Sequence, residues 1–572
     1  MLTSDLSIGQ LPDNVKELRL MVLELHKKLD EMEKNHEVEN QLLRERINQL
    51  LQEIYGRKSE KLSSLLSEYD GFEQSLLFEE PQGGNLKESE NTNRETEEEE
   101  IIVPEHKRKK RGRRPLPPEF ERIDIVHDLS EEEKQCGCDI EMEKIGEEIS
   151  EELEMSPARF WVVRHIRFKY ACKNENCEGV ERAEGERAVK IAPVPLQLIP
   201  KSIATPSLLS HILVSKFCDS LPFYRQEQQF RRLGLDLSRG TMCIWAVKVA
   251  EKCKRLVELL RQGILSGPLI NIDETTFQVL RESDRRVDSK SYMWVFRGGG
   301  PGSVAVVYIY DESRNGSVAS EFLGDFQGYV QTDGFSGYDF LDIREGIIHA
   351  GCWAHARRKF FTVVKVLGGK GKVENLEGFG KAGEAVQTIR DLYAIEKKAR
   401  DMDLPPELIY EERQQKSKPI LDKFKLWLEE LAPSVAPKSL LGKAVNYTLG
   451  QWPRLIKYLD NGILRMDNNL VENDIRPFVV GRKNWLFFDQ PGGADAGAIL
   501  YSLIETAKAN GLEPYHYLLY LFDKLPLFEG KCDEHLKALL PMNLSPEILA
   551  DHKKEYLKAR GQEETQIDDW CL

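Results

Sequence analysis

Apolar residues near the start of the chain recur at coiled-coil spacing. Leu18, Val22, Leu25, Leu29 and Met32 are four or three positions apart, as in the seam of a coiled coil. The seam resumes further along in a shifted phase, which indicates a stutter rather than a broken helix. We therefore predict a coiled coil within residues 1–80 through which the chain self-associates. The alternative is an amphipathic helix folded onto its own domain.

The next segment, residues 81–122, is strongly polar and changes sign along its length. Its first part is acidic and nearly free of large apolar side chains, so we expect a linker that cannot bury enough surface to fold. In the basic run that follows, seven of the eight residues 107–114 are Lys or Arg. Such a run can track DNA phosphates, and RGRRP resembles a minor-groove hook; the alternative is a solvated partner for the acidic tract. The residues predicted to contact DNA are Lys109, Arg111, Arg113 and Arg114.

Residues 123–195 predict a small β-rich module. Apolar and basic residues alternate over residues 160–170, which is typical of a strand with one exposed face. Structural zinc is usually held by cysteine pairs with two residues between them, whereas one and four residues separate the cysteines here. Zinc binding and a module that folds on its β core alone both stay open. The candidate ligands are Cys136, Cys138, Cys172 and Cys177.

The pattern becomes helical over residues 196–265. One helix, a turn at Gly234 and a second helix capped by Ser238 have the layout of a helix-turn-helix. Arg239 and Thr241 begin the second helix, where such helices present side chains to DNA bases. Helix pairs of this kind are also common as plain packing units, so both interpretations stand.

Residues 266–495 predict a mixed α/β core. Apolar runs at 270–280, 292–296 and 304–310 are separated by polar turns, and a helix and a further strand follow. Residues 383–464 are charged and helical in pattern, so we expect an all-α insertion there. The last segment, 496–572, predicts a helical tail. The expected fold class is therefore multidomain α/β.

Composition favours a soluble protein of several domains. A chain of 572 residues exceeds one core, and no run approaches the ~18 to 20 consecutive apolar residues of a membrane span. The start of the chain lacks the basic-then-apolar pattern of a secretory signal, so we expect a cytoplasmic protein. The formal net charge of −15 argues mildly against nucleic-acid binding, but the location of the positive charge matters more than the total.

Three acids in separate settings are candidate catalytic residues. Asp273 lies in INIDETTF and Asp333 in VQTDGFSGY, each at the end of a short apolar run that predicts a strand, and Glu472 lies among amides and cations in DNNLVENDIRPF. Carboxylates from separate elements can converge on hard divalent cations such as Mg²⁺, which keep open positions for water and phosphate. The three acids therefore predict phosphodiester chemistry.

Basic residues close to these acids in the sequence are candidate DNA contacts. Glu472 and Arg476 are four positions apart and share one helix face, with a surface ion pair as the alternative. The motif CWAHARRKF offers a positioning histidine and cations, which would otherwise form a solvated helix face. A second basic pair precedes Trp485 and supplies charge beside an aromatic ring. The predicted set is His355, Arg357, Arg358, Arg476, Arg482 and Lys483.

The order of these motifs, with HAGCWAHARRKFF before DNNLVENDIRPFVVGRKNWLFF, resembles the insertion sequence 66 family of bacterial DDE transposases. YGRKSEKL, KRGRRPLP and the cysteine-flanked block recur in the same order, so the resemblance covers most of the chain. It implies a ribonuclease H-like core in which Asp273, Asp333 and Glu472 hold two Mg²⁺ or Mn²⁺ ions, and a zinc-finger-like cysteine module. It also implies action on double-stranded DNA at the nucleoid, with small companion proteins of the same element as further partners.

We therefore expect a DNA transposase that cleaves insertion-sequence ends and transfers them to target DNA. Water and then a 3′-hydroxyl would attack in line. Two alternatives share many of these features: a DNA-binding regulator without catalysis, and a metal-dependent nuclease of the same fold. The GGGPG sequence at 298–302 lacks the lysine and Ser/Thr of a phosphate-binding loop, so we expect no ATP dependence.

Overall fold

The computed structural model describes residues 195–300, 302–368 and 376–560, together with a few positions between 160 and 191. The chain divides into two compact units, the larger of which contains the described residues 197–545. Described elements of the smaller unit are an antiparallel strand pair and one helix: β1 (Lys169–Ala171), β2 (Val189–Ile191) and α17 (Pro546–Lys558).

Several N-terminal predictions lie outside the described residues. These are the coiled coil, the acidic linker, the basic run and the metal-binding role of the cysteines. They stay predictions, and the residues concerned are Lys109, Arg111, Arg113, Arg114, Cys136, Cys138, Cys172 and Cys177.

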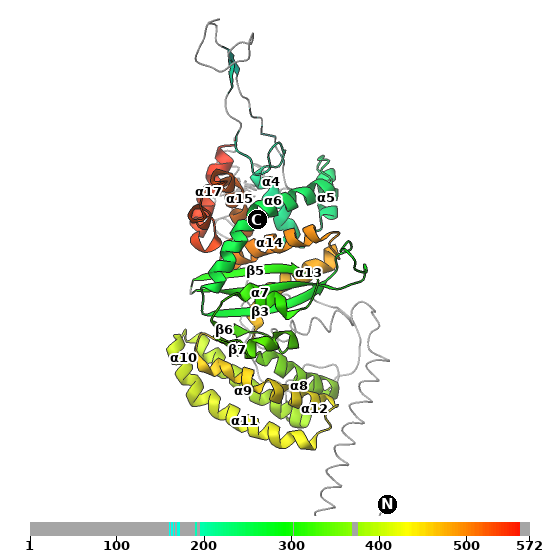
Figure 1. The fold of residues 1–572 in the computed structure, drawn as a ribbon, viewed down its shortest axis with the longest axis vertical. Helices are drawn as coiled ribbons and strands as arrows, with labels where there is room; N and C mark the ends of the chain where they lie inside the picture. The colour runs from blue at the N-terminus through cyan, green and yellow to red at the C-terminus, as the bar shows by residue number, and fades with distance from the viewer. Residues whose placement is uncertain are drawn as a thin grey trace, which may run out of the picture. The chain divides into compact units, whose positions relative to one another are not determined.

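Five strands of the larger unit form one mixed sheet with the order β5-β4-β3-β6-β7 (Figure 1). Three of them make an antiparallel meander: β3 (Leu269–Phe277), β4 (Ser291–Gly300) and β5 (Ser303–Asp311). They match the three strands predicted between residues 270 and 310, and the mixed α/β class is confirmed.

The other side of β3 is parallel. β6 (Gly328–Gln331) pairs with β3, and β7 (Ile347–Ala350) pairs with β6. Parallel neighbours need a crossover connection, and α7 (Gly316–Leu323) supplies the helix between β5 and β6. The central strand β3 therefore has an antiparallel and a parallel neighbour, and Asp333 follows the end of β6.

Three helices precede the sheet: α4 (Pro206–Phe217), α5 (Phe223–Arg232) and α6 (Arg239–Leu265). Gly234, at φ +84°, makes the turn after α5, a conformation that glycine adopts readily. Ser238 caps α6 by accepting a hydrogen bond from the backbone N–H three residues on, so the predicted cap is confirmed. Because α6 has 27 residues and packs on β4 and β5, it is also a structural helix of the core.

Helix α14 (Pro491–Ala509) closes the β5 edge of the sheet. Its polar side chains pair with backbone groups of β5 that have no neighbouring strand. The fit is geometric, because four residues of helix span about 6 Å and two residues of strand about 6.7 Å. The pairs, at 2.7 to 3.0 Å, are Ser502 with Tyr308, Thr506 with Val306 and Asn510 with Val304.

The described residues between α8 (Trp353–Gly368) and α13 (Asn469–Trp485) are helical or in turns and share an apolar core with α8 (Figure 1). The main helices of this cluster are α9 (Gly380–Asp401), α10 (Pro406–Glu412), α11 (Lys418–Leu431) and α12 (Leu440–Leu455). After α14, the unit continues with α15 (Pro514–Lys524) and α16 (Asp533–Lys537).

A buried ion pair fixes the end of this helical cluster. Arg413 is 2 % exposed and donates to both carboxylate oxygens of Glu396 at 2.7 and 2.8 Å. Its remaining donors bind the carbonyl oxygens of Tyr458, Asn461 and Leu464 at 2.6 to 2.8 Å. The five donated bonds hold the chain segment that leads into α13.

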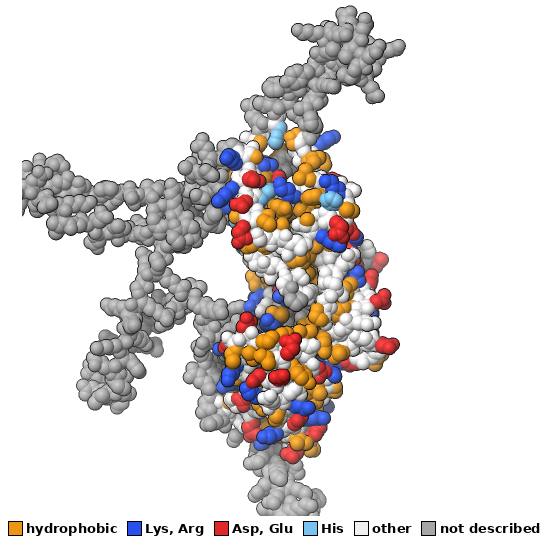
Figure 2. Space-filling model, turned by 90° about the vertical axis from the view of Figure 1, so that its left-hand side faces the viewer, with side chains coloured by type: hydrophobic (Ala, Val, Ile, Leu, Met, Phe, Trp, Pro, Cys, Tyr) orange, Lys and Arg blue, Asp and Glu red, His pale blue; other side chains and the backbone are white. Residues whose placement is uncertain are grey.

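The described surface carries charges of both signs. Figure 2 shows basic and acidic side chains interspersed on one face, with apolar side chains between them. Mixed charge of this kind produces no large single-signed field there. None of the helices in the described ranges has the length and apolarity that a bilayer crossing requires.

Candidate active site

A network of three buried side-chain amides holds the elements of the candidate site together. Asn271 of β3 donates from Nδ2 to Gln331 Oε1 at 3.0 Å and to Asn468 Oδ1 at 2.9 Å. Asn468 in turn donates to the Ile272 carbonyl oxygen at 2.9 Å, and Gln331 donates to the carbonyl oxygens of Gly351 and Arg465. Buried polar networks are rigid when fully satisfied, so β3, β6 and the start of α13 are held in register.

Asp273 lies on β3, two residues after Asn271. Its Oδ1 accepts a hydrogen bond from the Glu274 N–H at 2.9 Å. Burial, followed by the charges of Glu274, Glu472 and Asp333, holds the pKa of Asp273 well above its usual range. The charges of Glu472 and Asp333 thus act on Asp273 in addition to that of its neighbour Glu274, and the joint metal site of the three acids stays a prediction.

Asp333 lies in the loop after β6. Its Oδ1 accepts a hydrogen bond from Phe335 N at 2.9 Å, which fixes the tight turn. A Cβ on Gly334 would lie 2.5 Å from Tyr447 Oη, so the absence of a side chain lets α12 approach the loop. The helical cluster thus supports the second acid directly.

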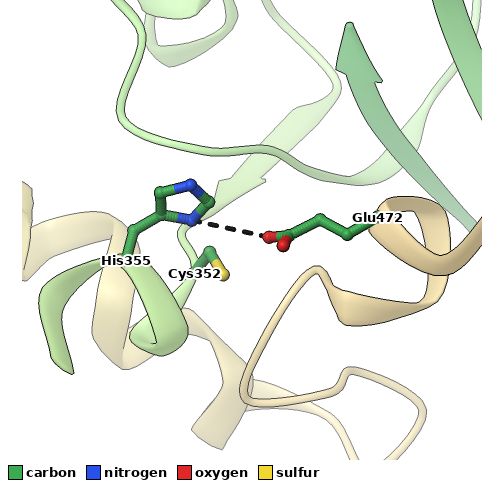
Figure 3. Close-up of side chains that lie close together, drawn as sticks. All are labelled: Cys352, His355 and Glu472. Atoms are coloured by element: carbon green, nitrogen blue, oxygen red, sulfur yellow. Dashed lines mark ion pairs between the residues drawn. The ribbon is translucent and has the colours of Figure 1, made fainter. Parts of the chain in front are cut away.

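Glu472 lies in the first turn of α13 and faces α8 (Figure 3). Its Oε1 is 3.7 Å from His355 Nδ1 and its Oε2 is 3.6 Å from Arg358 Nη2. Burial raises the pKa of Glu472, although Arg358 and Arg476 oppose the shift. Among the described atoms, neither Glu472 Oε1 nor His355 Nδ1 has a hydrogen-bond partner.

Cys352 is a member of the site that the sequence interpretation missed. Its sulfur, His355 and Glu472 offer ligand atoms within 4.8 Å of one another (Figure 3). Cys352 is 2 % exposed, and its Sγ accepts a hydrogen bond from Asn468 N at 3.2 Å. The spacing Cys-x-x-His at a helix start was the available signal, since positions i and i+3 share a helix face.

The acids adjacent to the candidate ligands have partners of their own. Glu274 pairs with Arg314 at 2.5 Å and accepts from Tyr338 Oη. Asp474 accepts from Arg297 Nη1 at 2.8 and 2.9 Å, and burial raises the pKa of Asp474 to about 6 despite Arg297. These pairings account for both acids without a metal.

The predicted DNA contacts differ in accessibility. Lys483 and Arg239 are exposed, and Arg476, Arg482 and Arg358 are half-buried. Arg482 Nη1 lies 3.5 Å from Thr275 Oγ1 on β3. On α6, the Thr241 hydroxyl lies 3.0 Å from Ser238 Oγ, and Arg239 lies over the Tyr224 ring.

Arg357 has a different environment from the rest of the predicted set. It is 3 % exposed and lies 5.4 Å from the centre of the Phe361 ring. Burial lowers the pKa of its guanidinium to about 10. The prediction that Arg357 contacts a DNA phosphate is therefore not supported in this conformation.

The fold and the site define a class of protein. A mixed α/β sheet carries a carboxylate cluster, from β3, the loop after β6 and α13, beside basic side chains. Clustered carboxylates with basic neighbours suit divalent cations and phosphate-bearing substrates. The class is a mixed α/β protein with buried acids beside basic side chains.

The comparisons name the family. Residues 201–496 match the transposase IS66 family, and residues 502–542 match the IS66 C-terminal element. Residues 133–178 match the zinc-finger binding domain of transposase IS66, and residues 42–125 match transposase C of IS166 homeodomain. The chain belongs to the IS66 transposase family, and is a DNA-binding transposase in this general sense.

Relatives that match most of the chain support the assignment. Uncharacterized protein y4jD of Sinorhizobium fredii (strain NBRC 101917 / NGR234) is 34% identical over 75% of this chain and 81% of its own length. Uncharacterized protein y4qI of the same organism is 29% identical over 95% of this chain and 99% of its own length. No solved structure matches the chain significantly.

Proposed function

We propose that this chain is a DDE transposase that cleaves the ends of its element and joins them to target DNA. Asp273, Asp333 and Glu472 would hold two Mg²⁺ or Mn²⁺ ions. The observation that supports the proposal is the amide network that joins β3, β6 and the start of α13, the elements next to the three acids. Burial, Glu274, Glu472 and Asp333 together raise the pKa of Asp273. The order β5-β4-β3-β6-β7, with a meander on one side and parallel strands on the other, is the order expected of a ribonuclease H-like core.

The donor set fits such ions. Three carboxylates supply the oxygen ligands that hard divalent cations prefer, and Glu472 Oε1 is buried without a hydrogen-bond partner among the described residues. Divalent ions bound by carboxylates lower the pKa of an attacking water or 3′-hydroxyl and stabilise the leaving oxygen. The amide network around Asn271 keeps the three carboxylates on adjacent elements in fixed positions.

The basic side chains would orient DNA around the triad. Arg358 lies 3.6 Å from Glu472 Oε2, where it can partner this carboxylate or a phosphate. Burial and the Arg358 charge lower the pKa of His355 to about 4, which favours the neutral imidazole, a form that can hydrogen-bond and orient water or substrate. Three further basic residues lie on α13 together with Glu472. They are Arg476, Arg482 and Lys483, and they would bind the phosphate backbone of the element end.

The N-terminal modules would select and pair the DNA ends. We assign DNA contact to the basic run at residues 107–114 and to Arg239 and Thr241 at the start of α6. The match of residues 133–178 to the IS66 zinc-finger domain supports Zn²⁺ at Cys136, Cys138, Cys172 and Cys177. The protein would self-associate through the coiled coil and act with small companion proteins of the same element. It would act at the nucleoid in the cytoplasm.

A strand-transfer assay with labelled element ends and Mg²⁺ tests this function. Each of three single substitutions should reduce both cleavage and strand transfer by about a thousandfold or more: Asp273→Asn, Asp333→Asn and Glu472→Gln. Residues that act as one unit contribute non-additively, so the loss of one removes most of the activity. DNA binding should persist. The matched control is Asp325→Asn, which removes an exposed acid and should leave both reactions intact.

The assay also separates the alternatives. A nuclease would cleave but not join ends, and a regulator would bind ends with no cleavage that depends on the three acids. Glu274 and Asp474 are unsuitable controls because each is committed to an arginine. If all three triad variants kept wild-type strand transfer, the proposed function would be wrong.

A further inference from the structure

Two unpaired ligand atoms face each other beside the triad. His355 Nδ1 and Glu472 Oε1 are 3.7 Å apart (Figure 3). Both atoms are buried, and neither has a hydrogen-bond partner within the described ranges. Their separation is too long for a hydrogen bond, but a zinc ion about 2.0 to 2.2 Å from each atom would span it.

A thiol completes the set. Cys352, His355 and Glu472 each place a ligand atom within 4.8 Å of the other two. Asn468 N donates to the Cys352 sulfur at 3.2 Å, and Trp353 Nε1 donates to the Leu455 carbonyl oxygen at 2.9 Å. The start of α8 is therefore held at the face that Glu472 approaches.

The donor chemistry distinguishes this group from the triad. Sulfur and imidazole ligands favour zinc and other borderline or soft cations, whereas magnesium favours oxygen ligands. Arg358 occupies the side of Glu472 Oε2, so Oε1 is the oxygen directed to His355. Glu472 thus belongs to two ligand sets of different preference.

We propose that Cys352, His355 and Glu472 form a zinc site that competes with the magnesium site for Glu472. Zinc binds the Cys352 thiolate, and the displaced thiol proton passes to solvent. The binding part stands on the geometry alone. Its consequence, inhibition of strand cleavage by zinc, rests on the proposed function because it requires Glu472 to serve the catalytic ions.

Metal counting on the full-length chain tests the binding part. Zinc equivalents are measured by equilibrium dialysis and elemental analysis, and Co²⁺ replaces zinc as a probe whose charge-transfer absorption reports thiolate ligation. Relative to wild type, Cys352→Ser and Cys352→Ala should each lose one equivalent and part of the cobalt absorption. The difference in zinc equivalents between the wild type and the variants is the quantity to compare. Zinc in the N-terminal cysteine module contributes equally to the wild type, Cys352→Ser and Cys352→Ala, so it cancels in that difference. Equal counts in correctly folded wild type and both variants would overturn the proposal.

Zinc titration of Mg²⁺-dependent cleavage tests the competition. Cys352→Ala should raise the inhibitory zinc concentration by more than about tenfold, since even indirect partners of a metal ligand contribute ten- to a hundredfold to affinity. The control is Cys532→Ser, which alters a surface Cys-x-x-His pair with Sγ 3.1 Å from His535 Nδ1 and should leave zinc sensitivity unchanged. Unchanged sensitivity in Cys352→Ala would refute the competition, whereas a chain without any Mg²⁺-dependent cleavage would refute the proposed function and leave the zinc count valid.

Discussion

Asn271 donates a hydrogen bond from Nδ2 to Asn468 Oδ1 at 2.9 Å, across 197 positions of sequence. The bond joins the central strand to the residue that precedes α13. Glu472 N also bonds to the Asn468 carbonyl oxygen at 3.3 Å, so Asn468 links β3 to the turn that carries the third acid.

Removing the Asn468 side chain should loosen this link. Asn468→Ala leaves one Asn271 N–H and the Ile272 carbonyl without that partner, and each unsatisfied buried group costs about 1–3 kcal/mol. Chemical denaturation should show the loss of unfolding free energy, and strand cleavage should fall with it. Asn469→Ala is the control one residue on, with an expected change within about 0.5 kcal/mol. Equal effects of the two substitutions would contradict the role of the network.

The buried pair of Arg413 and Glu396 should be a second sensitive point. Arg413→Met leaves a buried carboxylate unpaired and three carbonyls without donors, and breaking a buried pair costs about 3–5 kcal/mol. Urea titration measures the loss. The control is Lys416→Ala in the exposed pair with Glu412, where the expected change is at most about 1 kcal/mol. A small effect of Arg413→Met would mean that the helical cluster does not depend on this pair.

His349 should make the fold sensitive to acid. Its Nδ1 lies 2.7 Å from Asp342 Oδ1 and its Nε2 lies 2.8 Å from Thr332 Oγ1; burial and Arg454 lower the pKa of His349 to about 4. The unfolded chain binds a proton below pH 6.5, so this contribution to stability is full above that pH and is lost as pH falls from 6.5 to 4.

Denaturation at pH 7 and pH 5 measures the effect. The histidine contribution should fall by about 2 kcal/mol between these conditions, at about 1.36 kcal/mol for each pH unit below 6.5. His349→Gln should make the fall correspondingly smaller. If the wild type and His349→Gln lost equal unfolding free energy between pH 7 and pH 5, protonation of His349 would not account for the acid sensitivity of the fold.

The basic run should contribute to DNA affinity electrostatically. Replacing Lys109, Arg111 and Arg113 by alanine should reduce the slope of log affinity against log salt by about 0.9 for each lost phosphate contact. Binding isotherms at several salt concentrations give this slope. A charge-matched control replaces Lys416, Lys425 and Lys457, which pair with surface acids. An identical slope in both triple variants would remove the run from the DNA interface.

Local patterns in the sequence predicted the strands of the antiparallel meander and the start of α6. Alternating and continuous apolar runs located β3, β4 and β5 because their side chains face a core. Ser238 and Gly234 marked the start of α6 and the turn before it through local capping and backbone chemistry. Each of these features depends on residues that are close together in the sequence, and so it can be predicted from the sequence.

Features that depend on distant segments were not predictable in this way. The amide network joins Asn271, Gln331 and Asn468, which are 60 or more positions apart, and amides elsewhere in the sequence look identical. The burial of Arg357, which is 3 % exposed, likewise depends on segments distant in the sequence. Cys352 approaches Glu472 over 120 positions, and its Cys-x-x-His spacing indicates His355 as a neighbour but not Glu472.

The α14 side chains that bind β5 also limit where another chain can add a strand to the sheet. An open edge strand is a template onto which another chain can add a strand. Here Ser502, Thr506 and Asn510 already occupy backbone groups of that edge. Another chain would have to displace all three before it could add a strand beside β5, so this edge of the sheet is closed to strand addition.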